Sequence, residues 1–118
     1  MFRAQWGNAV PLVLGPRDPL LWPYLDNLAG AYFLFGRYVD GLEVGKRVVE
    51  MRPNNSWGYL DKAMTHGGLG QLEEARAAVR AARAVAPGLT LEAVRRSGAS
   101  PANIERMSAA LRQADLGD

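Results

Sequence analysis

The chain has 118 residues, of which 48 % are hydrophobic, so it is long enough for one globular domain and too hydrophobic for a disordered tail. Its formal net charge of +2 argues against a strongly basic surface, and a nucleic-acid partner is therefore not expected. The sequence contains no cysteine, which excludes disulfides, thiol nucleophiles and cysteine-ligated zinc.

Residues 1–18 open with MFRAQWGNAVPLVLG, a poor signal peptide because Pro11 interrupts its short apolar run. The stretch is interpreted either as a truncated second helix of a preceding repeat or as an irregular lead-in, and Pro11 would kink or shorten any helix there. Nothing in the sequence approaches the roughly 18 apolar residues needed to span a bilayer. We therefore expect a cytoplasmic protein with no membrane contact.

Four helices are predicted between the prolines at 19 and 87. Gly36 ends the first helix. Apolar residues recur along this helix at spacings of three and four: Leu21, Leu25, Leu28, Tyr32 and Phe35. A second helix runs from about Tyr38 to just before Pro53. The third is capped by Asn55 or Ser56 and ends near Gly70, and the fourth runs from about Leu72 to Val85.

Two glycines, Gly41 and Gly45, interrupt the second predicted helix. Each costs roughly 1 kcal/mol of helix stability relative to alanine. The second helix is therefore expected to be the weaker element, or to be bound by something.

Beyond Pro87, the pattern predicts a short helix capped by Thr90 and stopped by Gly98. A last helix follows, with Ser100 as its cap, Pro101 in its first turn and an apolar stripe at Ile104, Met107 and Leu111. A stack of helices needs a terminal helix with one polar face, and this one supplies it.

An internal repeat organises the chain: the prolines at 19, 53 and 87 are each 34 residues apart. The same shift aligns small residues with small residues and turn glycines with each other: Ala29 with Ala63, Gly36 with Gly70, and Gly41 with Ala75. With the large apolar Tyr38 and Leu72, this pattern resembles the tetratricopeptide repeat, a helix–turn–helix unit. The resemblance implies an all-α fold of helical hairpins stacked as a short right-handed solenoid with a C-terminal capping helix.

The repeat predicts one domain in four parts: residues 1–18 as a partial repeat or lead-in, 19–52 and 53–86 as repeats, and 87–118 as capping helices. In the family, the small residues lie where paired helices cross, which explains the alanine-rich run LGQLEEARAAV at 69–79. The tail also resembles the C-terminal region of bacterial multidomain signalling proteins, in which such repeats follow a class III adenylate or guanylate cyclase domain or a winged-helix domain.

The sequence contains no set of side chains at the spacing of a catalytic or metal-binding site, so we predict no enzyme activity, no cofactor and no metal site. The single histidine, His66, has no companions at metal-ligand or triad spacing and is interpreted as a packed or hydrogen-bonded residue. HGGLGQ lacks the preceding strand and the following Lys-Ser/Thr of a phosphate loop. Arg76, Arg80 and Arg83 form a basic stripe, interpreted as a solvated convex face paired with acidic neighbours, with phosphate binding as the alternative.

Family geometry places the first helix of each repeat on the concave side of the stack. The residues expected to bind a partner there are Asp26, Phe33, Leu34, Trp57, Leu60, Asp61 and Met64. The basic residues with which some family members hold a C-terminal carboxylate are absent from these places, which predicts an apolar groove with some acidic character. The opposing interpretation, left open, is that flanking helices bury these side chains.

Two functions remain. The first is a non-catalytic interaction module that binds a peptide or helix of a protein partner in the concave groove. The second is the C-terminal oligomerisation or regulatory region of a larger signalling protein, such as a nucleotide cyclase or winged-helix regulator, in which the groove meets a second copy of the chain.

Overall fold

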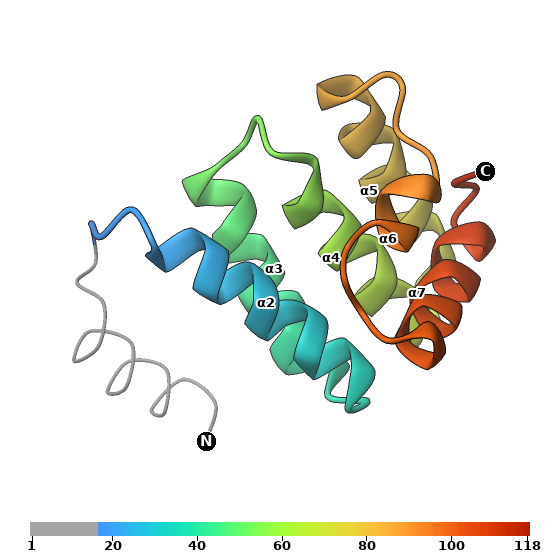
Figure 1. Cartoon of the computed structure of the whole chain (residues 1–118), viewed down its shortest axis with the longest axis horizontal. Helices are drawn as coiled ribbons and strands as arrows, with labels where there is room; N and C mark the ends of the chain where they lie inside the picture. Colours follow the sequence, from blue (N-terminus) through green and yellow to red (C-terminus); the bar gives the residue numbers. More distant parts are fainter. Residues whose placement is uncertain (1–16) are drawn as a thin grey trace.

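The computed structural model describes residues 17–118, and this part of the chain is helical without any strand. Helices α2 (Leu21–Leu34) and α3 (Tyr38–Met51) form one hairpin, and α4 (Ser56–Gly68) and α5 (Leu72–Val85) form the next. The short α6 (Glu92–Arg95) and α7 (Pro101–Gln113) follow, and Figure 1 shows them on the opposite side of α4 from α2. The predicted all-α fold of stacked helical hairpins is confirmed. The interpretation of residues 1–18 falls almost wholly outside the described residues.

The turns inside the two hairpins are copies of one another. Gly36 and Gly70 have φ values of 78° and 77°, in the left-handed region that glycine enters at little steric cost. In each turn the amide after the glycine donates to a carbonyl five residues earlier, Arg37 to Tyr32 and Gln71 to His66, both at 2.8 Å. This bond satisfies a carbonyl that the helix end would otherwise leave without a partner. The predicted glycine stops are confirmed.

Side chains cap two of the helices at their N-termini. The Asn55 Oδ1 accepts from the Trp57 amide at 2.9 Å, so Asn55, not Ser56, caps α4. At α7 the Ser100 hydroxyl accepts from the Asn103 amide at 3.2 Å, and Pro101 occupies the first turn as predicted.

Small residues lie where helices cross. A Cβ on Gly41 would be 2.8 Å from the Thr65 Cγ2, and one on Gly45 would be 3.3 Å from the Lys62 Cγ. Both glycines therefore bring α3 close to α4, and α3 is continuous through them. Close packing against α4 offsets the low helix propensity of the two glycines, and the expectation that this helix is the weaker element stays a prediction.

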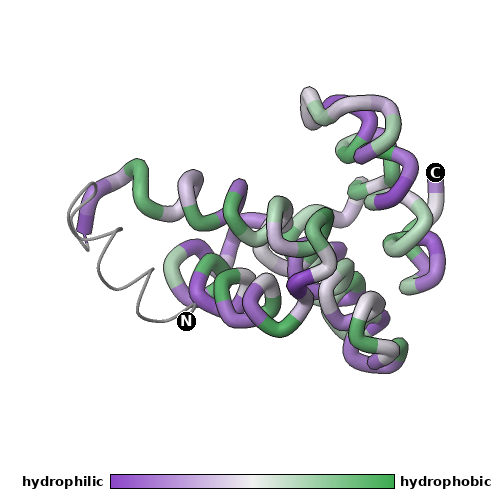
Figure 2. The backbone as a smooth tube through the Cα atoms, turned by 90° about the horizontal axis from the view of Figure 1, so that it is seen from below, coloured by the Kyte–Doolittle hydropathy of each residue, from purple (hydrophilic) through white to green (hydrophobic). Residues whose placement is uncertain are grey.

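The hydrophobic residues gather in two clusters. The smaller lies between α2 and α3 and contains Leu21, Leu25, Ala29, Val44 and Val48. The larger joins α4, α5, α6 and α7 and includes Leu60, Met64, Val79, Leu91, Val94, Leu111 and Leu116. Figure 2 shows hydrophobic and hydrophilic residues alternating along the helices, as amphipathic packing requires. No helix within residues 17–118 combines the length and apolarity required to cross a membrane.

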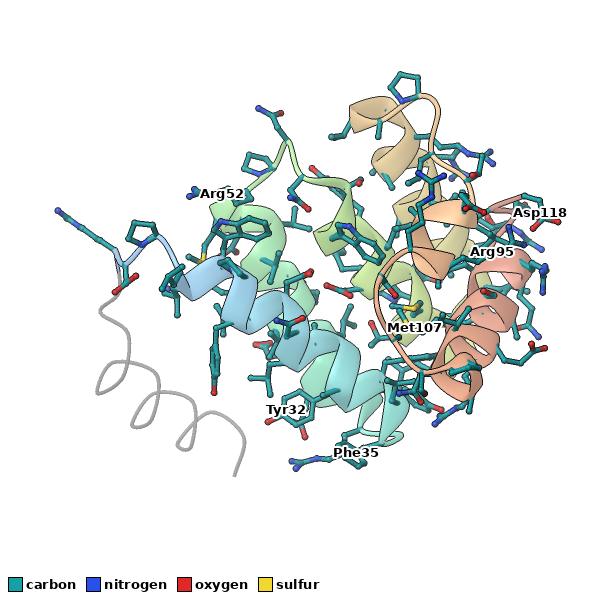
Figure 3. All side chains as sticks on the ribbon, in the orientation of Figure 1. Tyr32, Phe35, Arg52, Arg95, Met107 and Asp118 are labelled. Atoms are coloured by element: carbon teal, nitrogen blue, oxygen red, sulfur yellow. The ribbon has the colours of Figure 1, made fainter. Side chains whose placement is uncertain are left out.

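The C-terminal segment packs onto the second hairpin and also reaches the first. Helix α7 lies mainly against α4 and touches α2. The end of the chain returns to α6: the Leu91 amide donates to the Gly117 carbonyl at 2.9 Å, and Arg95 pairs with Asp118. Figure 3 shows Arg95 and Asp118 side by side at this edge of the molecule. The predicted terminal helices thus cover part of the α4 surface.

Candidate functional site

The main candidate site is a groove between α2, α4 and the segment that joins α6 to α7; we call it the concave groove. It encloses about 650 Å³. One face of α2 lines the groove, with lining residues at spacings of one, three and four. Helix α4 contributes two side chains, and the segment from α6 to α7 forms the opposite wall. Its lining residues are Asp26, Asn27, Gly30, Ala31, Leu34, Trp57, Asp61, Ala93, Arg96, Ser97, Gly98, Ala99 and Met107.

Four of the seven residues predicted to contact a partner lie in this groove: Asp26 and Leu34 on α2, and Trp57 and Asp61 on α4. Trp57 and Asp61 are one helical turn apart and therefore share a face of α4. The structure brings these four together from two different repeats.

The other three, Phe33, Leu60 and Met64, are buried in the larger core cluster. Leu60 and Met64 are fully buried, and α7 contributes Met107 and Leu111 to the same cluster. Their predicted position on an open concave surface is therefore wrong, because the C-terminal segment packs over that part of α4. In Figure 3 the Met107 side chain extends from α7 toward α4.

Sequence reasoning missed the wall that Arg96, Ala99 and Met107 form. Only the apolar spacing of Ile104, Met107 and Leu111 pointed to it, since that stripe requires a hydrophobic surface to pack against. The spacing did not reveal which surface this is.

Two carboxyl groups meet inside the groove. The Asp61 side chain belongs to a residue that is only 3 % exposed. Its Oδ2 and the Oδ1 of Asp26 are buried, and neither of these oxygens accepts a hydrogen bond from a donor group among the described residues. Burial away from water raises the pKa of Asp61 well above its ordinary value, and a side-chain hydrogen bond with Asp26 and the negative charge of Asp26 raise it further. Asp61 is therefore a carboxyl group that readily holds a proton.

The lining of the groove contains one basic side chain among the described residues, that of Arg96. The Arg96 Nε, at the wall, donates to the Glu92 Oε2 at 3.1 Å. Helix α3 packs against α4 beside Asp61 with Gly45, which brings no side chain. The electrostatic environment of Asp61 is thus set by Asp26 and by low solvent access.

Arg106 joins the two walls at the C-terminal end of α2. Its Nη1 donates to the Leu34 carbonyl at 2.6 Å, and its guanidinium lies 5.9 Å from the centre of the Phe33 ring. The bond gives a partner to a carbonyl at the helix end, where intrahelical donors run out. Arg106 therefore fixes α7 relative to α2 and helps to set the width of the concave groove.

The groove lining contains few of the side-chain types that catalytic sites use. Within residues 17–118 no group of three or more His, Cys, Asp or Glu side chains is placed to hold a metal ion. A carboxyl pair with one raised pKa can act in acid–base catalysis, but the lining described above supplies no histidine, cysteine or lysine to accompany it. The His66 Nδ1 donates to the Gln71 Oε1 at 2.8 Å, in agreement with its predicted hydrogen-bonded role.

The arginine stripe of α5 is paired at one end. Arg76 bonds to Glu73 at 3.2 Å and to Asp115 at 3.1 Å. Arg80 and Arg83 are exposed. This agrees with the interpretation of the stripe as a solvated face with acidic neighbours.

In a comparison with known families, residues 44–77 match the model described as "Tetratricopeptide repeat". The matched segment begins within α3, contains all of α4 and ends within α5. Such repeats are typical of modules that bind other proteins and are generally not catalytic. Neither the curated proteins nor the solved structures gave a match, so these comparisons offer no counterpart to the resemblance between the tail and cyclase-associated regions.

Proposed function

We propose that the chain is a non-catalytic protein–protein interaction module whose concave groove binds a peptide segment or helix of a partner. The observation that carries this proposal is the combination, in one groove, of apolar side chains with buried carboxyl oxygens that have no partner among the described residues. Polar atoms in such a position are normally satisfied, and a bound partner is one way to satisfy them.

The apolar part of the groove suits a side-chain anchor. Leu34, Trp57 and Met107 face it from three different helices. Tryptophan is enriched among the residues that dominate binding energy at interfaces, and methionine adapts its shape to a ligand. The proposed partner therefore inserts an apolar side chain close to Trp57.

The groove itself can be tested with a single attachment point, because the sequence contains no cysteine. Asn27→Cys places a thiol on an exposed residue of the groove lining. A benzophenone maleimide on that thiol is expected to cross-link a partner protein in extract of the source cells. Glu50→Cys, on an exposed position of α3 outside the groove, is the matched control.

Mass spectrometry of the cross-linked product distinguishes the two functions. A peptide from another protein, obtained from Asn27→Cys and not from Glu50→Cys, supports the interaction module. A peptide from a second copy of the chain supports the oligomerisation alternative instead. Equal products from both positions, or none from Asn27→Cys, contradict binding in the groove.

A further inference from the structure

We propose that the concave groove recognises a cationic side chain, an arginine or lysine of the partner segment, which enters between Asp26 and Asp61. The inference rests on the proposed function, since the partner segment supplies this side chain. It adds the chemical class of the recognised group.

The first argument is that an unsatisfied buried carboxyl requires compensation. Asp61 is 3 % exposed. Its Oδ2 and the Oδ1 of Asp26 are both buried, and neither accepts a hydrogen bond from a donor within residues 17–118. A buried ionised carboxylate is strongly unfavourable unless a cation or several donors accompany it. In the free chain a proton on the pair reduces this cost, and in the complex a cation takes its place.

The second argument is the position of the pair. Both carboxyl groups line the groove, one from α2 and one from α4, so a cation that enters it can contact both helices. An arginine guanidinium or a lysine ammonium carries several donors and no acceptor, which matches two carboxylates. Asp26 and Asp61 are thus the two carboxyl groups that the described lining offers to a cation.

The third argument is the aromatic neighbour. Trp57 lies one helical turn before Asp61 on the same face of α4 and lines the same groove. An indole face attracts a cation, and the methylene stem of arginine or lysine packs against apolar surface. The surroundings therefore accommodate both the charged head and the apolar stem.

The described part of the chain does not itself supply this cation. Arg96, the one basic side chain in the lining given above, bonds to Glu92 through its Nε. Arg106 donates to the Leu34 carbonyl at the end of α2. Each of these two arginines thus directs one donor to an acceptor other than Asp26 and Asp61.

Cation binding is coupled to proton release. Asp61 holds its proton more tightly than an ordinary aspartate, because of its burial and its contact with Asp26. A cation favours the ionised form and displaces that proton. Affinity for the cation therefore increases as the pH rises through the raised pKa of Asp61, and a neutral ligand lacks this dependence.

The test uses the full chain and two blocked amino acids as probes, N-acetyl-arginine methylamide and its citrulline analogue, which has nearly the same shape without the charge. Binding is followed by the amide and indole resonances of Trp57 in ¹⁵N NMR spectra. We expect the arginine probe to bind at least tenfold more tightly than the citrulline probe. Blocked lysine is expected to bind more tightly than its acetylated form.

Asp61→Asn is the decisive variant, because asparagine keeps the shape and removes the charge. We expect it to reduce the arginine preference to less than twofold, whereas Glu50→Gln, the same charge change on the exposed surface of α3, leaves the preference unchanged. Equal binding of arginine and citrulline by the wild type, or an undiminished preference in Asp61→Asn, overturns the inference. If the Asn27→Cys cross-link still forms in that case, the interaction module stands and only its cationic specificity is wrong.

Discussion

Helices α2 and α4 occupy equivalent positions in two successive repeats, yet their concave faces have different surroundings. Helix α2 lines the groove along its length, from Asp26 to Leu34. Helix α4 reaches it only at Trp57 and Asp61, and its remaining concave residues, Leu60 and Met64, are fully buried. The difference comes from α7, which packs against α4 and only touches α2.

The comparison shows that a repeat sequence determines the hairpin but not the exposure of its faces. The same turn geometry occurs at Gly36 and Gly70, and the same close helix crossings recur at small residues. Exposure depends on what lies on either side of each hairpin. The polar residues of the groove also come from non-equivalent positions, since Asp26 aligns with Leu60 and Asp61 aligns with Asn27 in the repeat.

The largest expected effect comes from weakening the cover over α4. Leu111 on α7 is fully buried in the larger cluster. Leu111→Ala should lower the free energy of unfolding by about 2–5 kcal/mol, because it removes buried methyl groups and leaves a cavity. Urea denaturation measures it. Leu72→Ala, at a residue that is 37 % exposed, is the control and should cost much less. Equal losses would mean that α7 does not cover α4.

A smaller loss should follow from overpacking the second hairpin. Ala82 is fully buried at the α5 interface. Ala82→Leu should reduce the free energy of unfolding by about 1–3 kcal/mol, since extra methyl groups force side chains and backbone apart. Ala81→Leu, at a half-buried neighbour, should be nearly neutral. Identical thermal unfolding of the two variants would contradict the register of the helices.

Replacing one groove carboxyl should increase stability. Asp61→Asn removes a buried acid, and the new amide can donate to Asp26, whose Oδ1 has no partner among the described residues. Folded Asp61 has a raised pKa and therefore binds more protons than the unfolded chain above the ordinary aspartate pKa of about 3.9. Its contribution to stability is then lost as the pH rises through the raised value.

The variant should accordingly be more stable than the wild type at pH 7, by a margin that narrows as the pH falls toward 4. Chemical denaturation at several pH values measures the margin. A constant margin, or a less stable variant, would show that Asp61 is not a destabilising buried acid.

The smallest effect is expected at the contact between α7 and α2. Arg106→Met keeps an apolar stem but removes the hydrogen bond to the Leu34 carbonyl. The expected loss is about 0.5–1.5 kcal/mol. Arg83→Met, on the exposed surface of α5, is the control and should change little. Hydrogen exchange at the end of α2 should accelerate only in Arg106→Met.

Local signals made much of the fold predictable. Glycine stops, the Asn55 and Ser100 caps and the 34-residue spacing act over a few residues or within one repeat, and each is found in the structure. Of the first-helix residues expected on the concave side, Asp26, Leu34, Trp57 and Asp61 line the groove.

The misplaced residues depend on long-range packing. The sequence pattern places Leu60 and Met64 on an exposed face of α4, whereas α7 packs over them in the structure. No local pattern specifies where α7 packs. The meeting of Asp26 with Asp61 depends on the offset between α2 and α4. Helical spacing within each segment does not contain that offset.

The titration of Asp61 tests the central claim most directly: that the groove holds a buried carboxyl pair that no cation from residues 17–118 compensates. The measurement is the ¹³C chemical shift of the Asp61 carboxyl carbon against pH, in the wild type and in Asp26→Asn. The account predicts a midpoint well above the ordinary aspartate value in the wild type. It also predicts a midpoint in Asp26→Asn that is lower but still raised, because burial is the largest cause. A wild-type midpoint at or below the ordinary value would show that a cation already compensates Asp61 and would contradict the account.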